Sequence, residues 1–587
     1  MFPAFFLSKF MLGHYFAAID IMTFWHILIG GWGMYKFLRL AGLDEKSSFI
    51  GGLLWPLNSH CIFLTANWFT VSVYFGWLPW IFYFCLKFIS GGGFLSLCLL
   101  VLCRLFAFSH GHAQYFVYSA IFEGLFFLAV VYTQRRFSRD LLISYGLSWL
   151  WTFILSLPLT LTMLHASAMS KDRSDALQFW AFASGGNNLF LWLFGAVWPF
   201  PFDLQHSAHI RTISSVFFSK TTWFHWFVPY LSHISYAGLF MAFYAVLKRQ
   251  KAKPLFSPFA WLFIFSLLWS IGGFDRIVYC LPYLNRFRYP IKLVLYVHFF
   301  LIGLACLGYS LFEALWTGER AKKTVFVSMV VLIFINLTGL YAFAPRRNFM
   351  THEEAVPSGV DIKGDFRDGR IITVGEVNGG KGSFAELDAF NYSTLFGTYH
   401  FSGVQNILPR ANVKAAGMLE KGMVRDTSDL NNNFGYFRAW GVKYYFIDKL
   451  SEPKFKPLLD KNGIVLQSSD TVRSVFTDAK AAPLVYLRDG GKADYQITTN
   501  AITIDLDSAE SNLLVLNFLY HPGFNASVDG YNAELALTPY GQISIPVEKG
   551  SHRILVRYLD TYLLAGGCFA IVAFLSGLWW FVFKRCE

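Results

Sequence analysis

The chain has 587 residues, of which 55% are apolar and 15% are charged, against about 25% charged in ordinary soluble domains. This excess of apolar residues excludes a water-soluble multidomain enzyme. The net charge of +12 is carried by short Lys and Arg clusters between apolar runs, so we predict no nucleic-acid partner. The 8 cysteines lie in or beside apolar runs, and we predict no disulfide framework.

About eleven apolar runs approach the roughly 20 residues that a bilayer-spanning helix needs. In chain order they are residues 17–40, 49–64, 71–89, 94–108, 115–132, 141–164, 223–247, 259–273, 291–315, 324–343 and 561–583. A shorter apolar segment, 189–199, is predicted to be re-entrant or interfacial, because about ten residues cannot cross hydrocarbon as a helix. The predicted fold class is a polytopic α-helical membrane protein with about eleven transmembrane helices in a lipid bilayer.

Lys and Arg clusters predict the orientation of these helices, because cytoplasmic loops carry an excess of both residues. The clusters occupy residues 36–46, 135–139, 248–253, 320–323 and 584–585. If all five clusters are cytoplasmic and the runs cross the membrane in alternating directions, residues 344–560 lie on the extracytoplasmic side. The same alternation places Met1 outside, which predicts that a first helix and its outer loop are missing. A genuine outside N-terminus is the alternative.

Composition changes after residue 343, where Gly, Asp, Asn and Lys replace Phe and Leu. We predict a multi-span transmembrane domain (1–343), an extracytoplasmic mixed α/β region (344–490), an extracytoplasmic β-sandwich-like region (491–560) and a C-terminal transmembrane helix with a cytoplasmic tail (561–587). The α/β region is predicted to contain strands at 370–374 and 442–447 and a helix at 433–440. Apolar and polar residues alternate at 501–506, 513–518, 542–547 and 553–558, which is typical of short antiparallel strands.

Cations on an outer loop run against the orientation rule and often have a ligand. The sequence NRFRYPIK places Arg286, Arg288 and Lys292 between an outer loop and the start of a helix. Arg offers a planar fork and Lys a point charge, so this trio is predicted to bind a lipid-linked phosphate. Snorkelling to lipid head groups is the alternative.

The sequence SHGHAQYF supplies further polar residues at the outer end of the fourth run, namely His110, His112 and Gln114. Their spacing fixes no third metal ligand, so no metal site is predicted and structural contacts are favoured, although a divalent cation is left open as a cofactor. Asp275 and Arg276 are predicted to form a local ion pair at a helix end.

Candidates for acid-base chemistry lie on the long outer loop before residue 223, namely Asp172, Asp175 and Asp203. A solvated loop explains the same residues equally well. In the outer domain, the aromatic residues Tyr520, Phe524 and Tyr531 are candidates for stacking on a sugar, with a place in the sandwich core as the alternative.

Five stretches carry a resemblance to a known family: HILIGGWGMYKFLRLAGL (26–43), SHGHAQYFVY (109–118), LPYLNRFRYPIK (281–292), WGVKYYFID (440–448), and YHPGFNASVDG with KGSHRILVRYLD (520–530 and 549–560). In these the chain resembles the bacterial YfhO membrane protein family. The resemblance implies a multi-pass, GT-C-like glycosyltransferase of the bacterial cytoplasmic membrane. Such an enzyme takes sugar from a polyprenyl-phosphate donor and transfers it to an envelope glycan acceptor, such as a teichoic acid, outside the cell.

The resemblance also implies an acidic base on a first outer loop, in the segment that this sequence is predicted to lack. Arg286, Arg288 and Lys292 would then stabilise the departing phosphate. Two alternatives remain open. A transporter or lipid flippase would show inverted repeats with broken helices, and a non-catalytic scaffold would recruit envelope enzymes through the outer domain.

Overall fold

The structure is a computed structural model that describes residues 15–62, 69–110, 113–169, 179, 193, 196, 233–248, 255–282, 284–287, 290–343, 369–374, 399–400, 424, 427–449, 451–469, 473–490, 493–498 and 500–584. The chain divides into two compact units. The helical unit draws its residues from Met1–Leu157, Ala176–His352 and Cys568–Glu587, and the sheet unit from Pro158–Asp175 and Glu353–Gly567.

Long apolar helices make up the helical unit. The helices outside the sheets are α2 (Tyr15–Leu40), α3 (Glu45–Leu57), α5 (Phe69–Ile89), α6 (Gly93–His110), α7 (Ala113–Thr133), α8 (Arg139–Met169), α13 (Tyr236–Leu247), α14 (Phe256–Ser270), α15 (Asp275–Cys280), the 3₁₀ turns η3 (Leu284–Arg286) and η4 (Pro290–Leu293), α16 (Val294–Glu313), α17 (Glu319–Phe343) and α24 (Thr561–Lys584). Every predicted apolar run overlaps one of these α-helices, so the predicted helical character is confirmed for the described residues.

Among the described residues, 4 helices are long and apolar enough to cross a membrane: Val71–Ile89, Gln114–Thr133, Arg139–His165 and Val294–Glu313. Shorter apolar helices accompany them at Gly93–Ser109, Tyr236–Leu247, Phe256–Ser270 and Thr561–Gly577. These lengths and compositions identify a multi-pass membrane protein. The number of spans and their direction across the bilayer stay predictions.

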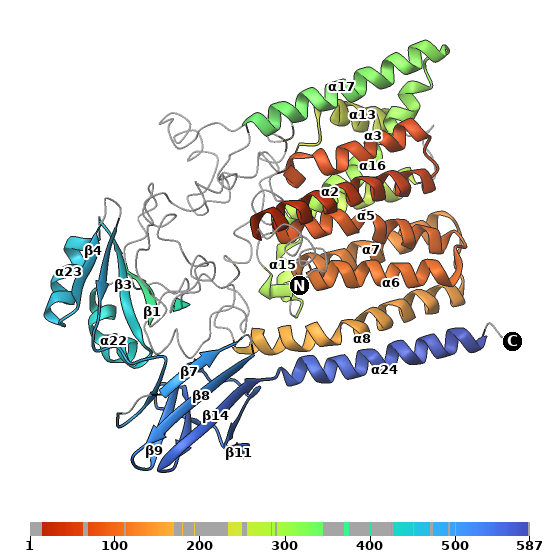
Figure 1. Ribbon diagram of the computed structural model, residues 1–587. Helices are drawn as coiled ribbons and strands as arrows, with labels where there is room; N and C mark the ends of the chain where they lie inside the picture. Colours follow the sequence, from red (N-terminus) through yellow and green to blue (C-terminus); the bar gives the residue numbers. More distant parts are fainter. Residues whose placement is uncertain are drawn as a thin grey trace. The chain divides into compact units, whose positions relative to one another are not determined.

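Helix α16 is the centre of the helical unit. Its residues from Val294 to Tyr309 are all buried, and it contacts α3, α13 and α14, while α2 packs against α3 and α5 (Figure 1). A helix that is apolar on every face belongs in such a central position. Glycines permit the close approach: a Cβ at Gly30 on α2 or at Gly308 on α16 would collide with a backbone carbonyl of the neighbouring helix.

Consecutive helices alternate in direction, so their connectors gather at two opposite ends of the helical unit (Figure 1). At one end, Lys46 Nζ lies 2.7 Å from Glu313 Oε1, which joins the start of α3 to the end of α16. We call this the Lys46 end. At the opposite end, Lys292 meets the start of α7, and we call this the Lys292 end.

The described residues of the sheet unit form three sheets. The first has the order β2-β1-β3-β5-β4, the second β11-β10-β14-β8-β7 and the third β12-β13-β9-β6. Their strands are β1 (Arg370–Val374), β2 (Tyr399–His400), β3 (Val442–Asp448), β4 (Val465–Ser469), β5 (Arg473–Thr477), β6 (Val485–Leu487), β7 (Ala493–Ile497), β8 (Ala501–Ser508), β9 (Asn512–Leu519), β10 (Phe524–Val528), β11 (Tyr531–Ala533), β12 (Ala536–Leu537), β13 (Gln542–Val547) and β14 (Gly550–Tyr558).

The first sheet is mixed: β1 pairs in parallel with β2 and β3, whereas β5 pairs antiparallel with β3 and β4. Helices α22 (Thr427–Ala439) and α23 (Glu452–Lys461) contribute Phe434, Phe437 and Phe455 to a core shared with β1 and β3. The predicted strands at 370–374 and 442–447 are confirmed. The predicted helix at 433–440 begins earlier, at Thr427.

The second and third sheets enclose one apolar core. It is formed by inward residues of both sheets, such as Ile504 and Ile554 from one and Leu514 and Ile545 from the other. All ladders within these two sheets are antiparallel. The period-two alternation that predicted strands in this region is therefore confirmed.

Candidate functional site

The connector between α14 and α16 carries the predicted phosphate-binding cations. It consists of α15, η3 and η4, so three short helical turns replace one open loop. Pro290 opens η4, which suits its fixed φ and its missing backbone N–H. Lys292 lies in η4, directly before α16 begins at Val294. The central helix α16 therefore fixes the backbone position from which the Lys292 side chain extends.

The Lys292 side chain packs against the start of α7 and is only 8% exposed. Its Nζ donates a hydrogen bond of 2.8 Å to Gln114 Oε1, and the ammonium group lies 5.9 Å from the centre of the Tyr115 ring. Gln114 in turn donates from Nε2 to the Tyr118 hydroxyl at 2.9 Å, one turn further along α7. The Gln114 amide thus orients both the Lys292 ammonium and the Tyr118 phenol. These two partners also determine which end of the amide is the oxygen and which is the nitrogen.

Tyr296 holds α16 against α7 one turn beyond Lys292. Its hydroxyl donates to the Tyr115 carbonyl oxygen at 2.9 Å and lies 2.7 Å from Ser119 Oγ. Its ring stacks on Phe122, with the centroids 4.3 Å apart and the planes at 10°. These contacts make the Lys292–Gln114 pair a fixed feature of the bundle rather than the chance meeting of two flexible side chains.

Asp275, the first residue of α15, lies on the same connector and is 6% exposed. The predicted ion pair with Arg276 is wrong: among the described residues Asp275 forms no salt bridge, and its Oδ1 accepts no hydrogen bond. The reason is that Asp275 turns inward while Arg276 is exposed. Burial raises the pKa of the Asp275 carboxyl to about 6.

The predicted trio is described only in part. Lys292 is placed as above, Arg286 ends η3 and is half-buried, and Arg288 lies outside the described residues. The structure brings together Lys292 and Gln114, which the sequence analysis had assigned to separate motifs. Whether the three cations form one phosphate site stays a prediction.

The remaining predicted polar residues lie mostly outside the described part of the chain. His112 and the three carboxylates Asp172, Asp175 and Asp203 are among them. His110 is described only as the last residue of α6. The predicted re-entrant segment 189–199 is described only at two positions, so it too stays a prediction.

A buried ion pair between α6 and α7 was missed by the sequence analysis. Arg104 Nε donates to Glu123 Oε2 at 2.9 Å, a second guanidinium N–H bonds Oε1, and both side chains are 1% exposed. Ser148 accepts from Arg104 Nη1 at 2.9 Å, and Tyr145 donates to Glu123 Oε1 at 3.1 Å, which adds α8 to the network. The signal was available, because each charged residue is the only one in its helix.

A second missed cluster lies where α3 ends. Asn58 Oδ1 accepts the Cys61 backbone N–H at 2.9 Å and lies 2.8 Å from His298 Nδ1 on α16. The His60 ring lies 5.7 Å from that of His298, and within the described structure neither His60 nitrogen has a hydrogen-bond partner. Asn58 therefore interrupts the apolar run with a turn that is anchored to the central helix.

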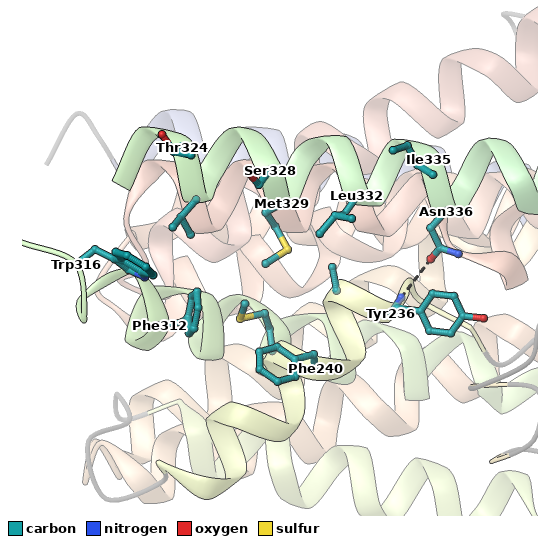
Figure 2. A pocket seen from close by; sticks show the side chains of 13 residues that line it. Tyr236, Phe240, Phe312, Trp316, Thr324, Ser328, Met329, Leu332, Ile335 and Asn336 are labelled. Atoms are coloured by element: carbon teal, nitrogen blue, oxygen red, sulfur yellow. Dashed lines mark hydrogen bonds between the residues drawn. The ribbon is translucent and has the colours of Figure 1, made fainter. Parts of the chain in front are cut away.

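An apolar groove of about 750 Å³ runs between α13 and α17 (Figure 2). Phe240 and Met329 line it from opposite sides, and Trp316 lies at the Lys46 end. At the other end, Asn336 Oδ1 accepts the Tyr236 backbone N–H at 3.1 Å. The described residues that line the groove are almost all apolar and include no charged side chain, so the groove suits a hydrocarbon chain.

The predicted aromatic residues of the sheet unit differ in exposure. Tyr520 and Phe524 are partly buried against the sandwich core, whereas Tyr531 on β11 is 81% exposed. Packing therefore accounts for the first two, and Tyr531 is the one of the three that a ligand can reach from solvent.

No protein-family model matches the chain, and no curated protein matches it. Among solved structures, it is similar to the cryo-electron-microscopy structure of arabinofuranosyltransferase AftD from mycobacteria, with a TM-score of 0.43 and 11% identity over 95% of this chain and 52% of that one. A structure of a mutant of AftD gives a TM-score of 0.44 and 10% identity, covering 95% and 55%. The chain thus spans about half the length of these structures. Likeness at this level carries no argument about the reaction, which rests on the chain's own residues.

Proposed function

We propose that this protein is a GT-C-like glycosyltransferase that moves a sugar from a polyprenyl-phosphate carrier to a cell-envelope glycan on the extracytoplasmic side of a bacterial membrane. The observation that carries the proposal is the buried Lys292 ammonium, oriented by Gln114 at one end of an apolar helical bundle. A positive charge buried in an apolar bundle needs polar partners, and Gln114 supplies one of them. A lipid-linked phosphate suits the site, because its chain lies in hydrocarbon while its anion lies near the helix ends.

The reaction requires charge stabilisation at the phosphate. An acceptor hydroxyl attacks the anomeric carbon, the new carbon–oxygen bond forms, and the bond from that carbon to the phosphate oxygen breaks. The electron pair of the broken bond stays on polyprenyl phosphate, and the hydroxyl proton passes to a base. Lys292 offers fixed positive charge where the phosphate gains negative charge, with Arg286 and Arg288 as further contributors from the same connector.

The sheet unit is assigned the acceptor in this proposal. The predicted α/β region (344–490) and sandwich region (491–560) supply a water-facing surface on which Tyr531 is an exposed aromatic residue. Aromatic faces stack on the apolar face of a sugar ring. The choice of sugar, of acceptor polymer and of any divalent cation is left open by these residues.

The proposal is tested first by binding. The intact protein in nanodiscs is titrated with radiolabelled undecaprenyl phosphate, with undecaprenol and inorganic phosphate as separate arms. We expect the Lys292→Met variant to bind undecaprenyl phosphate about tenfold or more weakly, because a hydrogen bond to a charged group contributes about 1.5–3 kcal/mol. Lys322→Met, the same change at the Lys46 end, is the matched control and should bind as the wild type does.

Transfer is tested next with a panel of undecaprenyl-phosphate-linked sugars and isolated envelope glycan, with release of undecaprenyl phosphate as the readout. Wild-type protein should release it from at least one donor, and Lys292→Met should reduce release about 10²–10³-fold. Equal binding by Lys292→Met and wild type would remove the phosphate role. Binding without release from any donor would favour a transporter or a scaffold.

A further inference from the structure

Asp275 is a buried carboxyl that, unlike Glu123 and Asp478, forms no salt bridge with another described residue. Glu123 bonds Arg104 in the helical unit, and Asp478 accepts a hydrogen bond of 2.6 Å from Arg438 in the sheet unit. Asp275 is 6% exposed, yet within the described residues it pairs with no cation. An unpaired carboxyl in such a place weakens the fold, so its presence points to a use.

The surroundings of Asp275 lead to the Lys292 site. Its carboxyl is close enough to Tyr118 to act electrostatically on that hydroxyl, and Tyr118 is the phenol that Gln114 contacts. Trp269 from α14 and Phe287 from the connector pack edge-on against the Tyr118 ring, at 5.5 and 5.7 Å between centroids. Tyr118 is therefore within electrostatic range of Asp275 and is hydrogen-bonded to the glutamine that accepts from Lys292.

The backbone holds the carboxyl in place. Gly272, just before α15, has a φ of +88°, and a Cβ there would lie 3.0 Å from Asp275 Oδ2. Glycine at this position both permits the turn and leaves room beside the carboxyl. The ionisable side chains on the described elements around Asp275 are, besides Tyr118, the following: Tyr115, Glu123 and Tyr132 on α7, Arg276, Tyr279 and Cys280 on α15, Arg286 on η3 and Lys292 on η4. Asp275 forms a salt bridge with none of the three cations among them.

We propose that Asp275 is the catalytic base of the transfer reaction. This inference rests on the proposed function. The Asp275 carboxylate accepts the proton of the acceptor hydroxyl as that oxygen forms its bond to the anomeric carbon. The bond between that carbon and the phosphate oxygen breaks at the same time, and its electron pair leaves on the phosphate beside Lys292. The proton then passes from the neutral carboxyl to water.

The chemistry suits a carboxyl of this kind. General bases act best when their pKa lies near the working pH, and burial moves Asp275 in that direction. Only the ionised form can accept a proton. Turnover should therefore rise with pH through about 6, where the Asp275 pKa lies, and level off above it. Oδ1 is buried and accepts no hydrogen bond from a described residue, so it is the carboxyl oxygen assigned to the substrate hydroxyl.

The test compares the pH profile of undecaprenyl phosphate release by wild type, Asp275→Asn and Asp275→Glu, together with undecaprenyl phosphate binding and thermal unfolding. Asp275→Asn should lower kcat about 10²–10⁴-fold, lose the inflection near pH 6 and bind undecaprenyl phosphate as the wild type does. Asp275→Glu should recover part of the rate together with an inflection. Asp140→Asn, the same change on an exposed residue at the Lys46 end, should leave the profile unchanged.

Thermal unfolding separates catalysis from structure. Since the charge on Asp275 is buried without a partner, Asp275→Asn should unfold at the same or a higher temperature than wild type at pH 8. An unchanged rate and inflection in Asp275→Asn would overturn this inference while leaving the proposed function intact. A large fall in unfolding temperature would also overturn it, in favour of a structural role. A wild-type protein that releases no undecaprenyl phosphate from any donor would overturn both proposals.

Discussion

Two buried polar regions of the helical unit share α7 yet treat charge in opposite ways. Near the middle of the helix, Glu123 is enclosed by the Arg104 guanidinium and the Tyr145 hydroxyl. At the Lys292 end, a buried ammonium bonds an uncharged amide, and Asp275 accepts no hydrogen bond at Oδ1 from any described residue. The first region is a closed ion pair that serves the fold, whereas the second holds an acid and a cation that form no salt bridge with each other among the described residues.

The neighbouring elements explain the difference. The Arg104–Glu123 pair is surrounded by side chains of α6, α7 and α8. One of them is Trp149, whose ring centre lies 3.8 Å from the guanidinium carbon of Arg104. The Lys292 end is instead built from a connector of short turns, η3, η4 and α15. Loops and short turns that a rigid scaffold positions are common places for binding residues, and this connector carries both Asp275 and Lys292.

The largest effect should come from breaking the enclosed pair. Glu123→Ala leaves the Arg104 guanidinium buried without its carboxylate, so we expect a loss of about 3–5 kcal/mol in the free energy of unfolding. The loss is measured by thermal unfolding of the purified protein in detergent.

The control for this prediction is the double replacement Arg104→Met with Glu123→Leu, which removes both charges and keeps similar volume. It should recover most of the lost stability, because no buried charge remains unpaired. If the double variant is as unstable as Glu123→Ala, the pair is not a closed structural unit and the comparison with the Lys292 end fails.

A smaller effect on stability, but a clear one on activity, should come from Gln114. Gln114→Leu removes the acceptor that orients Lys292 and the donor to Tyr118, so we expect release of undecaprenyl phosphate to fall about 10–100-fold. Unfolding should change by less than about 1.5 kcal/mol, the usual contribution of a hydrogen bond. Gln134→Leu, at the opposite end of α7, is the matched control for release. A large loss of stability without loss of turnover would make Gln114 a structural residue.

Local patterns predicted the elements of this fold, but not the contacts between them. Apolar runs predicted the helices and period-two alternation predicted β8, β9, β13 and β14, since each depends only on nearby residues. The Lys292–Gln114 hydrogen bond joins residues 178 positions apart, and no local pattern specifies such a pairing.

Asp275 shows that adjacency in sequence is a poor guide to ion pairing on a helix. An acid next to Arg276 suggests an ion pair, but successive residues of a helix point in directions about 100° apart, so neighbours do not face each other. The Arg104–Glu123 pair shows the reverse case. Single charges in two apolar helices were visible in the sequence, and the need to neutralise both in hydrocarbon would have paired them.

A third kind of polar contact, in the sheet unit, extends the comparison to groups that water reaches. The Nε2 atoms of His165, near the end of α8, and His521 lie 3.0 Å apart, and the His165 ring stacks on Tyr562 with centroids 4.4 Å apart. Asp560, beside them, accepts a hydrogen bond of 3.2 Å from Thr162. In the histidine contact one ring donates its Nε2–H and the other, which must be neutral, accepts at Nε2, so the contact cannot survive protonation of both rings.

The smallest effect should therefore be a pH dependence of unfolding with opposite signs at two histidines. Burial, followed by the charge of His165, lowers the pKa of His521, so its contribution to stability is present above about pH 6.5 and is lost as pH falls. The hydrogen bond to Asp529 raises the pKa of His552, so that contribution is present below about pH 6.5 and is lost as pH rises.

Thermal unfolding of the intact protein between pH 5 and pH 8 should show His521→Gln less sensitive to acid than wild type, and His552→Gln less sensitive to alkali. Equal acid sensitivity of His521→Gln and wild type would mean that water already screens the histidine contact, and the distinction between enclosed and open charges would then hold only inside the helical unit.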